Sequence, residues 1–501
     1  MHKILYFIVV FLLISSCNNS LKNQRSIENL VPNNAAIVLS INSLEGFKSA
    51  LNNTDLASKT ALFTPLQKAL KPLDSIQSMS PLLVCVSKEL QENVYTFITH
   101  RRNLKTKDSL LIPFIIIDSI LIASESEATL ETIKAQKGSD YSKIHKLHQV
   151  TNTFSLYHKE LPSLQSMPDV SFGAVFLEFN MTPESVTING HLLDAKSENK
   201  WFRLFEKLDP QSQGLQGVFP LESHNISIFN YTDFEQLQRN IDSLETSSKA
   251  SELAKAFFNT TKEIGVFETE QGDGVALKSI DISATYEALS GFQNELSSFR
   301  SIPLFEFTES SLFNDTFGPL LPKIRPTKFI TLEDYLVFSD SEEVLKLVIS
   351  NYFNKNTLES SVEYETLQKS LSDEVSIQTY FNNYRLAELL NTLFQSTLKG
   401  NELSDYKLSG IQLVKDDNIV HLNSVLQKSK PRQSKSLISE EFNLVLPEDI
   451  MMGPVFVSNH KTKGKDILVQ DIKNNLYLIS NKGVVLWKKT LNGAVSGAVK
   501  Q

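Results

Sequence analysis

The hydrophobic and polar positions of the chain follow the same short pattern twice. Residues 121–127 read Leu-Ile-Ala-Ser-Glu-Ser-Glu with Leu130 behind them, and residues 336–342 read Leu-Val-Phe-Ser-Asp-Ser-Glu with Leu345 behind them. In each copy an apolar run ends at a serine, which suits a helix N-cap, and acidic residues follow where the helix dipole favours them. The pattern therefore predicts a strand, a cap and a helix at both places.

The flanking segments repeat in the same order. Tyr141 and Leu147 correspond to Tyr364 and Leu371, and residues 154–157 correspond to residues 377–380. The strand pair 173–177 and 185–189 corresponds to the pair 410–414 and 418–422. The strand-to-helix segment 36–51 corresponds to the segment 225–237. We expect an α+β protein with two tandem homologous modules, over residues 29–199 and 200–428. Each module would hold an antiparallel sheet whose helices cover one face. The modules would pack face to face, with a ligand groove between them.

The pattern changes behind residue 428. Residues 429–440 predict a solvated basic linker, with a lipid or partner contact as the alternative, because four cations surround Pro431: Lys428, Lys430, Arg432 and Lys435. Residues 441–501 then show short apolar runs at about ten-residue spacing, separated by Asn and Gly, which predicts an all-β segment.

This last segment resembles a known repeat. The run from Ile467 to Trp487 is similar to a blade of the PQQ-like β-propellers, in which Trp487 would pack the blade and Gly483 would form its tight turn. One blade cannot close a ring, so we expect an incomplete propeller-like stub. Either the chain is a truncated form of a longer protein, or the stub docks on the second module.

Most of the chain behind the first 16 residues, including the stretch from Val31 to Ala35 that leads into the first strand, resembles flavobacterial lipoproteins. In that group a duplicated domain of unknown function stands ahead of propeller repeats. The resemblance implies the same domain order here and no particular activity.

Residues 1–16 predict a signal peptide. The apolar run from Ile4 to Ile14 is shorter than the roughly 20 residues that span a bilayer. The tetrad that ends at Cys17 resembles the lipobox of bacterial lipoproteins, which implies cleavage behind Ser16 and acylation of Cys17. Residues 17–28 would form a lipidated tether, and Asn18 resembles the signal for the outer membrane, facing the periplasm. A chance cysteine in a cleaved secretory peptide is the alternative.

The charge and cysteine content limit the classes of ligand and chemistry that we expect for this chain. The formal charge is -8, and loss of residues 1–16 removes Lys3 and no acid, which makes it -9, so the chain has no electrostatic reason to bind nucleic acid. The second cysteine, Cys85, lies in an apolar strand-like run, which predicts a buried thiol rather than a nucleophile.

The familiar catalytic signatures are absent from the sequence, and we expect no cofactor and no metal. The best metal-like group is His145 and His148 at helical spacing, with Asp140 and His158 nearby, but zinc needs three or four ordered ligands. We interpret that group as a solvated helix surface.

Two further charged groups have a structural interpretation. The first is a pair of acids at each helix start: Glu125 and Glu127, and Asp340 and Glu342. The second is a set of cations in a hairpin loop, with anionic lipid as the alternative contact: Arg101, Arg102, Lys105 and Lys107.

Three functions remain open. The first is a surface-tethered, non-enzymatic binding or scaffold protein of the bacterial envelope, held to the membrane by its lipid, with an unknown protein or polymer partner. The alternatives are a periplasmic hydrolase with a dispersed active site between the modules, and an outer-membrane assembly factor.

Overall fold

The computed structural model describes residues 25–59, 81–89, 92–103, 112–145, 153–159, 173–193, 200–244, 251–318, 320–321, 324–394, 397–417, 419–429, 442–459, 461–497 and 499–501. Within them the chain is α+β, because helices surround sheets in which every strand pairing is antiparallel. This confirms the predicted fold class.

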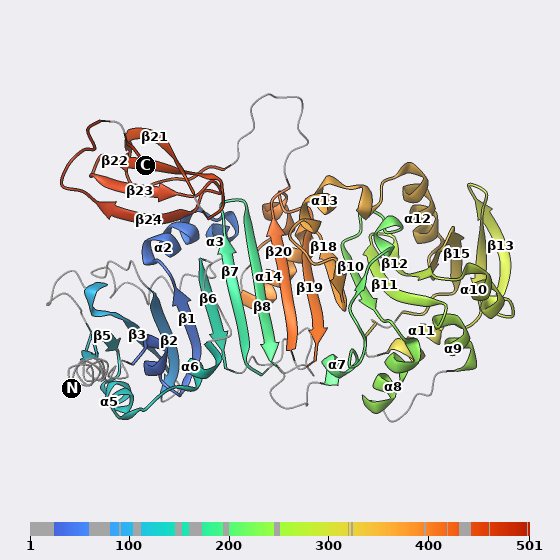
Figure 1. Ribbon diagram of the computed structural model, residues 1–501. Helices are drawn as coiled ribbons and strands as arrows, with labels where there is room; N and C mark the ends of the chain where they lie inside the picture. Colours follow the sequence, from blue (N-terminus) through green and yellow to red (C-terminus); the bar gives the residue numbers. More distant parts are fainter. Residues whose placement is uncertain are drawn as a thin grey trace, which may run out of the picture.

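One long sheet runs through the molecule (Figure 1). Eighteen described strands pair in the order β4-β5-β3-β2-β1-β6-β7-β8-β20-β19-β18-β10-β11-β12-β16-β15-β14-β13. The strands of the first half are β1 (Ala35–Ile41), β2 (Leu82–Glu89), β3 (Glu92–His100), β4 (Phe114–Ile117), β5 (Ile120–Ser124), β6 (Phe154–His158), β7 (Val175–Met181) and β8 (Ser185–Leu193). Those of the second half are β10 (Asn225–Asn230), β11 (Thr261–Thr269), β12 (Gly272–Ser279), β13 (Gln293–Phe299), β14 (Ile302–Phe307), β15 (Lys328–Leu332), β16 (Tyr335–Ser339), β18 (Ile377–Phe381), β19 (Ser409–Asp416) and β20 (Ile419–Gln427).

Short helices connect these strands. The α-helices are α2 (Leu44–Asn53), α3 (Asp55–Lys59), α5 (Glu127–Ala135), α6 (Asp140–Ile144), α7 (Lys200–Arg203), α8 (Phe234–Leu244), α9 (Glu252–Phe258), α10 (Ile282–Leu289), α11 (Leu312–Phe317), α12 (Glu342–Asn354), α13 (Val362–Gln368) and α14 (Asn383–Phe394). The 3-10 helices are η1 (Ile27–Leu30), η4 (Arg101–Asn103), η6 (Leu215–Gly217), η7 (Leu358–Ser360) and η8 (Gly400–Leu403), and β9 (Gln211–Ser212) pairs with β17 (Glu374–Val375) in a separate ladder.

The two halves join edge to edge, at the pairing of β8 with β20. Asn189 lies opposite Asn423 and His191 lies opposite His421 in this register. The expected face-to-face packing, with a groove between the modules, is therefore wrong. The physical reason is that β8 and β20 each end a half-sheet with unpaired backbone donors and acceptors, and pairing the two edges satisfies them.

Helices cover both faces of the sheet, so the expectation of one-sided helices is also wrong. Consecutive β2 residues belong to different cores: Leu82 and Val84 pack with α2, whereas Leu83 and Cys85 pack with η1 and α5. In β10 likewise, Phe229 faces the core that includes α8 and α9, and Ile228 faces the core that includes α12. A strand with apolar residues on both faces needs cover on both.

The two predicted strand–cap–helix segments are present as β5–α5 and β16–α12. The N-caps are Ser126 and Ser341, whose hydroxyls accept hydrogen bonds from the amides of Thr129 (3.2 Å) and Val344 (3.3 Å). The predicted caps, Ser124 and Ser339, lie two residues earlier, so the predicted cap positions are wrong by two residues. Each of these serines instead accepts the N–H of the N-cap residue, Ser124 at 3.2 Å and Ser339 at 3.1 Å.

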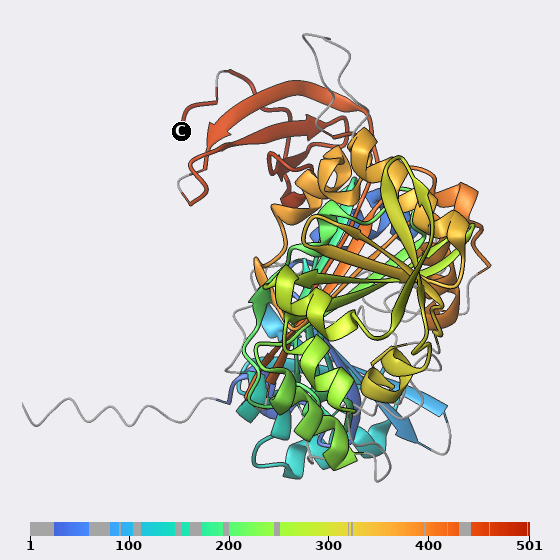
Figure 2. The ribbon, with the colours of Figure 1, turned by 90° about the vertical axis from the view of Figure 1, so that its right-hand side faces the viewer.

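Residues 450–490 form a separate four-stranded antiparallel sheet, in the order β21 (Ile450–Ser458), β22 (Lys465–Asp471), β23 (Asn475–Ile479) and β24 (Val485–Thr490). Its small core contains Val469, Tyr477 and Val485. Figures 1 and 2 place this sheet over the end of the first half, against α2. The expected docking on the second module is wrong, because α2 belongs to the first half.

Candidate functional site

The contact between α2 and the four-stranded sheet, which we call the junction, is the candidate site. Gly46 of α2 lies so close to β24 that an added Cβ would stand 2.9 Å from the carbonyl oxygen of Val485. Beside this contact, the backbone N–H of Val445 donates to the side-chain oxygen of Asn53 at 3.0 Å. The sequence allows the approach because a glycine, with no Cβ, occupies the first turn of α2, where its N–H donates to the Ser43 hydroxyl at 3.1 Å.

A cavity of about 450 Å³ lies on one side of this contact. Its helix wall consists of Glu45, Lys48, Ser49, Asn52 and Asn53, and its sheet wall consists of Val445, Leu446, Pro447, Tyr477, Val485 and Lys488. The ammonium group of Lys488 lies 5.5 Å from the centre of the Tyr477 ring, which holds the cation over an aromatic face. This cavity therefore combines apolar surface with charged and amide groups at its rim.

A second cavity of about 370 Å³ lies where the ends of β1, β6 and β7 meet the same sheet. Its lining combines neutral polar residues, two charged residues and an apolar part. The neutral polar residues are Asn42, Ser43, Thr153, Asn180, Thr182, Asn459, Thr462, Ser480 and Asn481, the charged ones are Asp466 and Lys482, and the apolar ones are Phe47, Val484, Val485 and Leu486. The wall is partly rigid, because Asn459 donates to Asp466 at 2.9 Å. The side chains of Asn180 and Asn481 make no hydrogen bond to any described residue, so they can bond to a ligand.

The sheet at the junction is itself held by a buried carboxylate. Asp471 is fully buried and accepts hydrogen bonds from Tyr477 Oη (2.9 Å), Asn475 Nδ2 (2.8 Å) and the amides of Asn475 (2.8 Å) and Lys473 (2.9 Å). Burial alone raises the pKa of this carboxyl, but these hydrogen bonds outweigh it and lower the pKa below its ordinary value. The turn that carries Tyr477 into the cavity wall is thereby fixed.

Sequence reasoning did not single out the junction. Its residues come from segments 42–53, 153–182 and 445–488, which are far apart in the chain and carry no motif. The available signal was Gly46, a glycine inside a segment with helical periodicity, which indicates a close backbone approach.

The residues that the sequence suggested for chemistry form no common site within the described part of the chain. Cys17 and residues 1–24 lie outside the described residues, as do His148, Lys105 and Lys107. His145 lies 3.5 Å from Glu28 and within 3.4 Å of the Tyr141 hydroxyl. In the described part of the chain, no three or more His, Cys, Asp or Glu residues come together as metal ligands.

The remaining predictions have structural outcomes. Cys85 is fully buried in β2, as predicted, and burial raises the pKa of its thiol. Glu127 and Glu342 lie in the first turns of α5 and α12, also as predicted, but the prediction is wrong for Glu125 and Asp340, which precede the N-caps Ser126 and Ser341. Arg101 and Arg102 are exposed in η4, which follows β3. Lys428, expected beside a solvated linker, instead pairs with Asp55 at 3.5 Å. The other cations of the predicted linker, Lys430, Arg432 and Lys435, lie outside the described residues.

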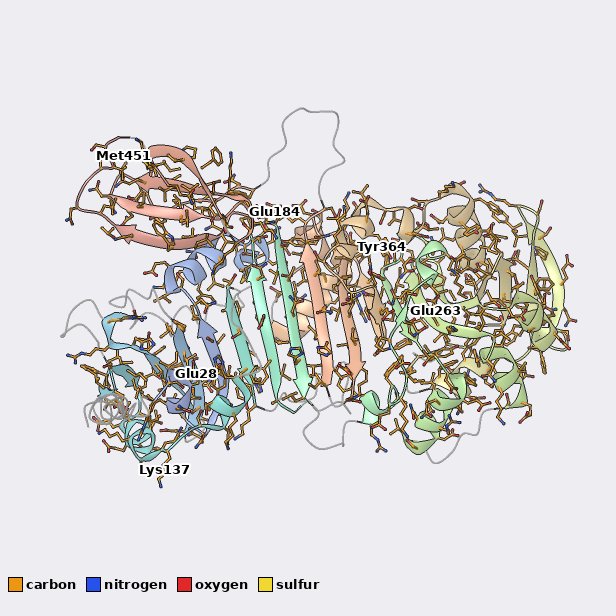
Figure 3. All side chains as sticks on the ribbon, viewed as in Figure 1. Glu28, Lys137, Glu184, Glu263, Tyr364 and Met451 are labelled. Carbon is orange, nitrogen blue, oxygen red and sulfur yellow. The ribbon has the colours of Figure 1, made fainter. Side chains whose placement is uncertain are left out.

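A buried acid that the sequence did not indicate lies in the second half. Figure 3 labels this residue, Glu263. Both of its carboxylate oxygens lie 3.0 Å from the amide nitrogen of Gly214, which donates to them. Burial raises the pKa of Glu263 to about 7, although the hydrogen bond from Gly214 and the charge of Lys278 oppose the shift. Glu263 holds the segment before β10 against the sheet, away from the junction.

Within the described residues, no helix is long and apolar enough to cross a bilayer.

Comparisons with known proteins do not assign this chain to a family. No family model matches the chain, and no curated protein matches it either. A solved structure described as crystal form III of TP0453 is similar over 38% of this chain and 90% of that chain, with 14% sequence identity and a TM-score of 0.22.

Proposed function

We propose that this chain is a lipid-anchored, non-enzymatic binding protein of the bacterial envelope whose ligand occupies the junction between α2 and the four-stranded sheet. The observation that carries this proposal is the pair of cavities on either side of the Gly46–Val485 contact. Concave sites between separately folded parts, with apolar walls and a few polar groups, are where ligands preferentially bind.

The lining favours a neutral, polar partner. In the second cavity neutral amides and hydroxyls outnumber the single carboxylate and the single ammonium group. Such groups both donate and accept hydrogen bonds, which suits the peptide groups of a protein segment or the hydroxyls of a polymer. The ligand would therefore be a protein or polymer of the envelope rather than a charged small molecule.

Site-specific photo-crosslinking in living cells tests this function. A photoreactive amino acid at Asn481, in the wall of the second cavity, is expected to give a discrete crosslinked product of the full-length protein. The matched control is the same replacement at Leu296, which is 52% exposed on β13 and far from the junction. Crosslinking of equal strength at both positions, or at Leu296 alone, would refute a binding role for the junction.

We also propose that Cys17 carries the lipid and that the protein resides at the outer membrane, facing the periplasm. The support is the order of basic start, short apolar run and Ser-Ser-Cys in the first 17 residues. A Cys17→Ser protein should leave the membrane fraction, and mass spectrometry should find acyl chains on the wild-type peptide that begins at residue 17. A Cys17→Ser protein that stays with the membrane would contradict the anchor.

We infer that the two halves are copies of one module. Three recurrent features support this. The rings of Tyr141 and Tyr157 lie 5.4 Å apart, as those of Tyr364 and Tyr380 lie 5.8 Å apart. Strand β1 lies between β2 and β6 as β10 lies between β11 and β18, and a 3-10 helix followed by a proline precedes each first strand.

We propose that residues 441–501 are one blade of a propeller-like repeat, as in the flavobacterial lipoproteins that the sequence resembles. Four antiparallel strands in sequence order support this, as does Gly483, whose φ of +78° in the turn before β24 suits glycine. The blade would serve here as one wall of the binding site.

A further inference from the structure

The start of the described chain is fastened to one small region of the first half. Arg25 donates from its guanidinium to the backbone oxygen of Gln136 at 3.2 Å, and the Gln136 amide donates to the backbone oxygens of Asn29 (3.2 Å) and Val31 (2.8 Å). The Ser139 hydroxyl donates to the backbone oxygen of Glu28. From Arg25 onward, the chain is therefore fixed to the segment between α5 and α6. Residues 25–28, predicted as part of the tether, belong instead to the folded body, where Ile27 begins η1 and is buried.

The anchor can lie only a short distance from this point. Arg25 is eight residues beyond Cys17. Even a fully extended chain of that length reaches only about 28 Å, at roughly 3.5 Å a residue. Residues next to Arg25 are therefore held within about that distance of the lipid, whichever way the body tilts.

We propose that the α5–α6 end of the first half faces the bilayer and that the junction, with its four-stranded sheet, faces away from it. Figures 1 and 2 place α5 and α6 at the opposite end of the first half from β21–β24. Figure 3 places Lys137 at the first of these ends and Met451 at the second. This orientation rests on the proposed lipid anchor at Cys17, and its partner is the phospholipid surface.

Tether length rather than charge keeps the α5–α6 end near the bilayer. Two of the nearby cations are paired within their own helices, Lys134 with Glu131 and Lys143 with Asp140. An anchored body with a short tether keeps its attachment point close to the lipid without any further contact energy. The consequence is that both junction cavities open where a partner in the aqueous compartment can reach them.

Energy transfer to a labelled lipid tests the orientation. Lys137→Cys and Met451→Cys, both at exposed positions, would each receive a donor dye on the full lipidated chain, bound to phosphatidylethanolamine–phosphatidylglycerol vesicles that contain an acceptor-labelled lipid. Background labelling is low because Cys17 carries the lipid and Cys85 is fully buried. We expect the transfer efficiency at residue 137 to exceed that at residue 451 by about twofold or more, because the tether limits only the first distance.

The controls distinguish this inference from the anchor itself. The same two variants with Cys17→Ser should neither float with the vesicles nor transfer energy. If the lipidated protein floats and residue 451 transfers as well as residue 137 or better, the orientation is refuted while the anchor stands. If the lipidated protein does not float, the anchor is refuted, and the orientation with it.

Discussion

Gly46 and Val485 bring the first half and the four-stranded sheet into backbone contact: a Cβ on Gly46 would stand 2.9 Å from the Val485 carbonyl oxygen. Backbone on both sides of a contact cannot move aside as a flexible side chain can. This position therefore determines whether the two parts can close on each other.

Gly46→Leu is expected to separate the four-stranded sheet from α2 without unfolding either part. Hydrogen–deuterium exchange should rise in peptides that contain Val445 and the end of α2, because the bond from Val445 to Asn53 is lost. Gly291→Leu is the control, since no atom lies within 4 Å of a Cβ there. Unchanged exchange in the Gly46 variant would show that the contact does not hold the sheet.

Glu263 should make the stability of the second half depend on pH. Its folded-state pKa of about 7 lies above the ordinary value of 4.5, so the fold favours the protonated form. The stability this contributes is complete below about pH 4.5 and is lost as pH rises through 7, by up to about 3 kcal/mol. Urea unfolding between pH 5 and 9 should show this loss in the wild type.

The Glu263→Gln variant should have a flatter profile over the same range, because it cannot ionise. Glu270→Gln, at an exposed position in the β11–β12 turn, should keep the wild-type profile. A wild-type stability that rises between pH 5 and 9 would contradict the direction of the shift.

Asp471→Asn should destabilise the four-stranded sheet strongly. Each Asp471 oxygen accepts two hydrogen bonds, and an amide nitrogen in place of one of them would face donors from Asn475 and Tyr477. Leaving such buried groups unsatisfied costs about 1–3 kcal/mol, enough to unfold a small sheet. Fluorescence of Trp487 in β24 should report a lower melting temperature, whereas Asp449→Asn, at an exposed position, should not change it.

If the two halves are copies, the equivalent caps should have equivalent energies. Ser126→Ala and Ser341→Ala are each expected to cost about 1 kcal/mol in unfolding free energy, because each removes one side-chain acceptor from a helix start. The two costs should add in the double variant, since the sites lie in different halves. Ser298→Ala on β13, where the side chain is exposed, should cost nothing measurable.

The local parts of the fold could be predicted from the sequence. Ser124 and Ser339, the serines that end the strand-like runs, indicated both helix starts to within two residues of the observed caps, and the apolar neighbours of Cys85 indicated its burial. The run from Leu82 to Val86 also indicated that helices cover both faces of the sheet, because an unbroken apolar strand is buried on both faces.

The long-range arrangement could not be predicted. Residues 185–193 indicate a strand, but nothing in them specifies that its free edge pairs with residues 419–427 more than two hundred positions later. The junction was missed for the same reason: Asn180 and Asn481 are unremarkable polar residues until the fold brings them to one cavity. The local sequence indicates whether a segment forms a strand or a helix and which of its faces is buried. The strand with which it pairs depends on the whole chain.

The β8–β20 pairing also has a mechanical consequence. Two domains joined by a flexible linker can move relative to each other. Here a backbone ladder of nine residue pairs joins the two halves into one rigid unit. Bending this unit at its centre would break the backbone hydrogen bonds between β8 and β20. An opening and closing motion is therefore expected of the four-stranded sheet, whose described contacts with the first half lie at α2 and at the ends of β1, β6 and β7, away from the β8–β20 ladder.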